Sequence, residues 1–169
     1  MPLIDRHARV IEDLWTYADS TASAEIAAKS IIELEVLASL TGHADLPLPV
    51  GVFARAGTTA EQLAPHLDQV ELVAVEFPKF RDGRGFTTAR MLHDKYGFKG
   101  DIRAIGHVLP DQFAEYLQCG FSSVLLPPDH PPDQWVIPSE GGGTGASRGL
   151  LLQRLLRKPA ASAAEPGTS

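Results

Sequence analysis

Residues 70–97 read VELVAVEFPKFRDGRGFTTARMLHDKYG and hold a predicted strand, loop and helix in one run. Residues 70–77 are apolar except for Glu71 and Glu76, a pattern typical of a strand buried on both faces of a parallel sheet. Over residues 86–96, four residues repeat at the spacing of one helix face: Phe86, Ala89, Leu92 and Tyr96. The loop between strand and helix is therefore expected where open α/β sheets place ligand sites.

The same alternation extends in both directions along the chain. Further strands are predicted at residues 29–32, 50–54, 101–106 and 121–126, and helices at 34–40, from Thr58 and from Leu109. Strands separated by helices of this length imply right-handed parallel crossovers. We expect a single α/β domain of alternating βα units, with a mainly parallel sheet that is an open sheet or a partial barrel.

A chain of 169 residues with 44% hydrophobic residues has room for one complete core. We place the α/β domain at residues 29–137, after an N-terminal segment, 1–28, whose structure the sequence leaves uncertain. Residues 138–169 are expected to form a glycine-rich link, a short helix at about 150–156 and a disordered tail.

Positive charge is concentrated in one part of an acidic chain. Residues 79–103 carry seven Lys and Arg against three Asp, whereas the whole chain has a net charge of −6. This pattern favours a small anion or an acidic protein surface as the ligand, and argues against nucleic acid, which usually binds a broadly basic domain.

The loop that follows the strand at residues 70–77, with Gly83 and Gly85, supplies most of the candidate site residues. Arg84 and Arg90 would lie near free N–H groups at the start of the helix and could form an anion clamp. The alternatives are that Arg84 bonds loop carbonyls and that Arg90 pairs with Asp94. The candidates from this segment are Lys79, Arg81, Asp82, Gly83, Arg84, Gly85 and Arg90.

His107 and Asp111, which follow the predicted strand at residues 101–106, are also candidates. His107 ends the strand at residues 101–106 and precedes Asp111, a position from which an imidazole could act as a general acid or base. An exposed or capping histidine is the alternative.

The sequence shows no motif for a cofactor or a metal. Cys119 is the single cysteine, which excludes an internal disulfide and any cluster held by several cysteines of this chain, and the six histidines are scattered. We expect Cys119 to be a small packed residue. No run approaches the ~20 apolar residues of a membrane span, so a cytoplasmic protein without membrane association is expected.

Several motifs in order resemble an uncharacterised bacterial domain-of-unknown-function family. They include Phe77-Pro78-Lys79-Phe80, Asp82-Gly83-Arg84-Gly85-Phe86-Thr87, Gly100-Asp101-Ile102-Arg103-Ala104, Asp111-Gln112 and Cys119-Gly120-Phe121. The resemblance covers residues 50–126 closely and adds weight to Arg84, Arg90, Arg103, Asp111 and Gln112. His107 and His93 depart from the family pattern, which has an acid and an arginine there, so His107 is a secondary candidate. Arg103 is also secondary, because it lies near the start of a strand, where it could serve the fold instead.

Members of that family are commonly encoded beside assimilatory sulfite reductase and are often labelled oxidoreductases of sulfite reduction. The resemblance implies an accessory protein, with an oxidoreductase role by association, that acts in sulfur assimilation with the sulfite reductase haemoprotein. Two alternatives stay open: an enzyme or sensor that binds a small phosphorylated or carboxylated metabolite, and a scaffold for sulfite reductase without catalysis.

Overall fold

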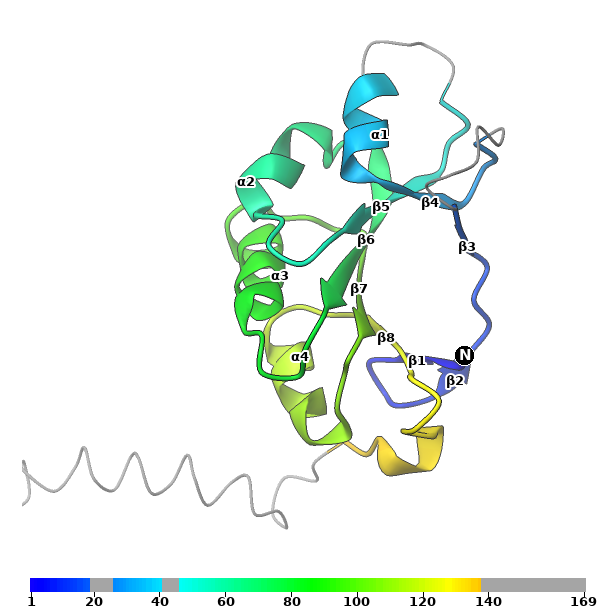
Figure 1. The fold of residues 1–169 in the computed structure, drawn as a ribbon, viewed down its shortest axis with the longest axis vertical. Coiled ribbons are helices and arrows are strands. Elements are labelled where there is room, and N and C mark those ends of the chain that lie inside the picture. The colour runs from blue at the N-terminus through cyan, green and yellow to red at the C-terminus, as the bar shows by residue number, and fades with distance from the viewer. Residues whose placement is uncertain (19–25, 41–45, 138–169) are drawn as a thin grey trace, which may run out of the picture. The chain divides into compact units, whose positions relative to one another are not determined.

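The computed structural model describes residues 1–18, 26–40 and 46–137, which contain an eight-stranded mixed sheet curled into a half-barrel (Figure 1). The strand order is β2-β1-β8-β7-β6-β5-β4-β3. Strands β3 to β8 lie side by side in chain order and are parallel, whereas β1 is antiparallel to both of its neighbours. The strands are β1 (Leu3–Asp5), β2 (Val10–Ile11), β3 (Thr16–Tyr17), β4 (Ser30–Glu33), β5 (Val50–Ala54), β6 (Val70–Phe77), β7 (Asp101–Gly106) and β8 (Ser123–Leu125).

Four α-helices of the described chain cover one face of the sheet: α1 (Leu34–Leu40), α2 (Ala60–Leu63), α3 (Arg84–Asp94) and α4 (Phe113–Gln118). Short 3₁₀ turns follow α2 at Ala64–His66, precede α4 at Pro110–Gln112 and lie at Pro132–Gln134. Each α-helix contributes buried residues to the same hydrophobic cluster as the sheet, for example Leu37 from α1 and Leu92 from α3. The helices therefore share the convex face.

Side chains of strand β6 pack on both faces of the sheet. Val73, Val75 and Phe77 belong to the cluster under the helices, whereas Leu72 and Ala74 belong to a second, smaller cluster on the opposite face. Because successive side chains of a strand point to opposite faces, a strand buried on both sides must be apolar almost throughout. This requirement explains the sequence of residues 70–77.

The sheet must curl because its two edges are joined by a short connection. Eight strands spaced about 4.8 Å apart would span roughly 33 Å if the sheet were flat. The edge strands β2 and β3 are separated only by residues 12–15, and the chain from Ile11 to Thr16 can reach at most about 18 Å. Residues 10–17 thus run along the side of the sheet opposite the helices and bridge the open side of the half-barrel (Figure 1).

Arg103 on β7 holds this bridging segment to the inner face. Its side chain is 3% exposed, and Nη1 donates to Asp13 Oδ1 at 2.9 Å and to the Tyr17 hydroxyl at 3.0 Å. Burial alone would lower the pKa of Arg103, but the hydrogen bonds to Tyr17 and Asp13 and the charge of Asp101 outweigh it and raise the pKa. The guanidinium therefore stays charged inside the half-barrel.

Four aromatic rings fill the core between the sheet and helices α3 and α4. The centroid of Phe77 lies 5.1 Å from that of Phe86 and 5.4 Å from that of Tyr116, and Phe121 completes the group. Gly85 lies directly over Phe77, because a Cβ atom at this position would fall 2.7 Å from Cζ of the ring. The first turn of α3, next to the candidate loop, is thus fixed against the sheet.

Most predicted elements are confirmed. Strands β5, β6 and β7 and helix α1 have the predicted bounds, and the partial-barrel alternative is confirmed in the form of the half-barrel. Helix α3 begins at Arg84 rather than Phe86, because the Asp82 carboxylate accepts the Arg84 N–H and allows the helix to start before the apolar stripe.

The sheet is mainly parallel, as predicted, but its N-terminal strands add antiparallel pairs that the prediction did not include. The sheet is mixed, since β1 pairs antiparallel with β2 and β8, and three strands lie within residues 1–28, where none was assigned. These strands are two or three residues long and are set by pairing with distant parts of the chain. The predicted link, helix and tail at 138–169 lie outside the described residues.

We predict that Gly106→Ala lowers the free energy of unfolding by about 2–4 kcal/mol. Gly106 has φ +93°, and an added Cβ would lie 2.5 Å from the backbone oxygen of Phe77. Gly97→Ala is the matched control, since Gly97 has φ +61° with nothing within 4 Å and should lose only about 1 kcal/mol. Urea denaturation measures both, and equal losses would contradict the proposed close contact.

We also predict that Arg103→Met lowers the free energy of unfolding by about 3 kcal/mol, because Asp13 loses its buried partner. Adding Asp13→Asn should recover part of this loss, with a coupling of at least about 1 kcal/mol in a double-mutant cycle. The exposed Arg81→Met should change stability by less than about 0.5 kcal/mol. Additive effects at Arg103 and Asp13 would show that the ion pair does not hold the bridging segment.

Candidate functional site

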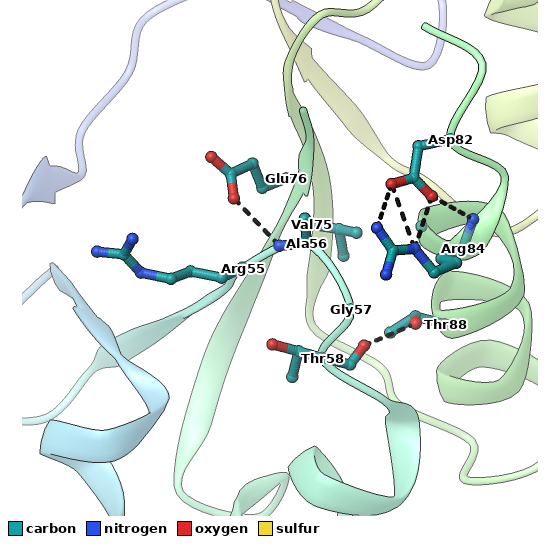
Figure 2. Close-up of a pocket in the computed structure, with 10 residues that line it drawn as sticks. Arg55, Ala56, Gly57, Thr58, Val75, Glu76, Asp82, Arg84 and Thr88 are labelled. Carbon is teal, nitrogen blue, oxygen red and sulfur yellow. Dashed lines mark hydrogen bonds and ion pairs between the residues drawn. The ribbon is translucent and has the colours of Figure 1, made fainter. Parts of the chain in front are cut away.

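The carboxyl edge of the parallel strands carries two groups of charged side chains, separated by the loop between β5 and α2. In Figure 2, Arg55 and Glu76 lie on one side of the backbone of Ala56 and Gly57, and Asp82 and Arg84 lie on the other. We call Glu33, Arg55 and Glu76 the inner group and Asp82 with Arg84 the outer group.

The outer group is a closed ion pair. Arg84 donates through Nε to Asp82 Oδ1 at 2.9 Å and through Nη2 to Oδ2 at 2.6 Å, and its backbone N–H donates to Oδ1 at 3.1 Å. The hydrogen bonds from the Arg84 side chain and backbone lower the pKa of Asp82 to about 2. The carboxylate that occupies the start of α3 thus belongs to the protein itself.

The space between this pair and the inner group is small. Thr88 Oγ1 donates to the Thr58 carbonyl at 3.0 Å, and the Arg84 guanidinium lies over Gly57, where an added Cβ would fall 3.2 Å from Nη1. The cavity that remains between the two groups measures about 10 Å³. That volume is roughly what one water molecule needs, so no larger ligand fits between the outer and inner groups unless a side chain moves.

The loop before α3 presents three exposed side chains in a row, Lys79, Phe80 and Arg81, which we call the basic loop. The Phe80 side chain is 46% exposed, and the Arg81 guanidinium carbon lies 5.3 Å from the centroid of its ring. The N–H of Asp82 donates to the Lys79 carbonyl at 3.0 Å and closes the turn. The loop therefore offers cations beside an apolar ring.

Gln112 fixes the basic loop from the neighbouring segment. Its Nε2 donates to the Phe80 carbonyl at 3.2 Å, and its Oε1 accepts from the hydroxyl of the buried Tyr116 at 3.0 Å. Asp111 and His107 are exposed nearby in the chain, and the His107 N–H donates to the Phe77 carbonyl at 2.7 Å. Gln112 is the only one of these three whose side chain makes a described contact with the loop.

Arg90 and Arg103 lie apart from the outer group. Arg90 Nη2 lies 3.5 Å from Sγ of the buried Cys119, so the expected clamp of Arg84 and Arg90 is not formed in the structure. Arg103 lies inside the half-barrel with Asp13 and Tyr17. The glycines have local roles, since Gly83 precedes α3 and Gly85 packs on Phe77.

Our sequence-based candidates omitted the inner group. Glu33 and Arg55 form an ion pair, and Glu76 Oε2 accepts the Ala56 N–H at 3.1 Å. The sequence carried a signal for Glu76, an acid near the carboxyl end of an otherwise apolar strand. Arg55 follows a predicted parallel strand and so belongs to the carboxyl edge, but its pairing with Glu33 depends on β4 and β5 being neighbours in the sheet.

Among the residues that the structure describes, no group of three or more His, Cys, Asp or Glu side chains is arranged to hold a metal ion. Within the same residues, no helix has the length and apolar character needed to span a membrane.

Removing the Arg84 side chain should raise the pKa of Asp82 from about 2 toward its ordinary value of 3.8. A folded-state pKa below the unfolded value means that the pair stabilises the fold above the unfolded pKa and loses its effect as pH falls through about 2. Carboxyl ¹³C NMR titration of wild type and Arg84→Ala measures this shift. Arg81→Ala serves as the control, and an unchanged Asp82 pKa in Arg84→Ala would contradict the pairing.

Comparison with known proteins gives one family. No curated protein and no solved structure matches the chain. The family model described as "Bacterial protein of unknown function (DUF934)" matches residues 51–138, just over half of the chain and the part that holds β5 to β8 and the basic loop. The chain therefore belongs to the DUF934 family of bacterial proteins.

Proposed function

We propose that this protein is an accessory component of assimilatory sulfite reduction, and that its basic loop binds an acidic surface of the sulfite reductase haemoprotein. The pathway is suggested by the motif resemblance, because members of the family are commonly encoded beside that enzyme. The observation that carries the docking role is the exposed, fixed run of Lys79, Phe80 and Arg81. The proposal assigns binding to this chain and electron transfer to its partner.

The charges of the loop favour a protein surface over a small anion. Arg84 is already neutralised by Asp82, and a small anion at the start of α3 would have to displace that carboxylate. Lys79 and Arg81 make no ion pair among the described residues. Both cations therefore remain available to an acidic partner.

The exposed ring adds to this argument. Aromatic and arginine side chains are enriched at the centres of protein interfaces, and an aromatic ring often supplies much of the binding energy. Phe80 with Arg81 above it provides such a pair, while Lys79 adds charge that would speed association. Binding through this surface should weaken as salt concentration rises.

The proposed pathway is tested by growth of a strain that lacks the gene. Failure on sulfate and on sulfite, with rescue by sulfide, is the expected result, because sulfide enters sulfur assimilation after the reduction of sulfite. Growth on all three sulfur sources, in a strain without a second copy of the gene, would refute the pathway.

The docking surface is tested with purified proteins and charge reversal. The double substitution Lys79→Glu and Arg81→Glu should weaken binding to sulfite reductase about tenfold or more, because acidic groups would then face an acidic surface. The matched control is Lys95→Glu with Lys99→Glu, which reverses two exposed cations near the other end of α3. Calorimetry at two salt concentrations measures both, and equal losses in the two variants would refute the assignment to the loop.

The supporting residue gives a finer test. Gln112→Ala removes the bond to the Phe80 carbonyl and leaves every cation in place. We expect binding to weaken about threefold, mainly through faster dissociation, because the loop loses its fixed conformation. If sulfite itself bound tightly to the free protein and Arg84→Ala removed that binding, the small-anion alternative would replace docking.

A further inference from the structure

A second cavity opens at the mouth of the half-barrel, on the inner side of the β5–α2 loop. It measures about 270 Å³ and is lined by residues from the carboxyl ends of β3, β4, β5 and β6. Its lining residues are Tyr17, Ala18, Ile31, Glu33, Phe53, Arg55 and Glu76. Neither the basic loop nor the outer group contributes to it, so a ligand here would be independent of the proposed docking surface.

The cavity has an apolar side, formed by Tyr17, Ile31 and Phe53, next to its charged residues. Ile31 belongs to the inner hydrophobic cluster, and Phe53 is packed against that cluster. Tyr17 is held from the other side, because its hydroxyl accepts a hydrogen bond from Arg103. Two aromatic rings on fixed strands can contact the apolar body of a small molecule without a large loss of conformational freedom.

The charges at the cavity leave one carboxylate in excess. Arg55 forms an ion pair with Glu33 and also lies near Glu76, so two carboxylates face one guanidinium and the net charge of the lining is −1. Among the described residues, Glu76 accepts one hydrogen bond, from Ala56 to Oε2, and Oε1 has no hydrogen-bond donor. A ligand with a protonated amine could donate to this carboxylate and place its charge close to aromatic rings.

We propose that this cavity binds a small molecule in which a protonated amine is joined to an apolar or aromatic body. An anion would meet the excess carboxylate, and the described residues include no cluster of three ligands for a metal ion. A neutral apolar molecule would gain no attraction from the excess carboxylate. A ligand with a protonated primary amine and an apolar body can pair with the carboxylate and pack against the apolar side chains of the cavity.

Three probes of nearly equal shape test the charge preference: 2-phenylethylamine, 2-phenylethanol and 3-phenylpropionate. Each is titrated at pH 7 into the ¹⁵N-labelled full chain and followed by the amide signals of Ile31, Phe53 and Ala56. The amine should bind in the millimolar range and shift these signals. Equal or tighter binding of the alcohol or the carboxylate would overturn the proposal, as would the absence of any shift.

A pair of substitutions on one strand separates the cavity from general electrostatics. Glu76→Gln should weaken binding of the amine about fivefold or more, and the amide oxygen it introduces can still accept the Ala56 N–H. Glu71→Gln makes the same change at the other end of β6, where Glu71 is exposed, and should leave affinity unchanged. Equal effects of the two substitutions would overturn the assignment to Glu76.

A third variant guards against a structural effect of Glu76→Gln. Glu33→Gln removes one carboxylate from the cavity and leaves Arg55 without its described partner, so the amine should again bind more weakly. The amide spectra of all variants show whether the fold is retained. Unchanged affinity in both Glu33→Gln and Glu76→Gln would refute a role for the cavity carboxylates.

Discussion

The short connection between strands β2 and β3 constrains the rest of the structure. Four residues cannot link the edges of a flat eight-stranded sheet, so the sheet curls and its inner face becomes enclosed. Polar groups that are buried on an enclosed face need hydrogen-bond or ion-pair partners within the protein. Arg103 meets this need by binding Asp13 and Tyr17, which also holds the connection in place.

The curl also divides the charged edge of the sheet. Side chains that point into the half-barrel reach the cavity with Glu76, whereas Asp82 and Arg84 lie on the helix side of the β5–α2 loop (Figure 2). The two groups differ in chemistry as well as place. The outer pair neutralises itself, and the inner group keeps an excess carboxylate, so one edge can support two separate binding events.

The aromatic core and the basic loop depend on each other. Tyr116 packs against Phe77 and Phe121, and burial raises the pKa of its hydroxyl, which therefore remains a hydrogen-bond donor. That hydroxyl positions Gln112, which in turn binds the Phe80 carbonyl. The packed core thus holds the exposed loop in one conformation. A loop that is already ordered loses less conformational entropy when it binds a partner.

The sequence by itself determined the parallel strands and their helices. Strands buried on both faces must be almost entirely apolar, as residues 70–77 are. Helix ends are set by nearby residues such as Gly97, which can be read directly from the sequence. It also located the basic loop. Only the tertiary structure decided that Arg84 is neutralised, that Arg90 lies beside Cys119, and that the inner group exists. These features, like the pairing of strands β1 to β3, depend on contacts between residues far apart along the chain or on side-chain geometry, which spacing in the sequence does not fix.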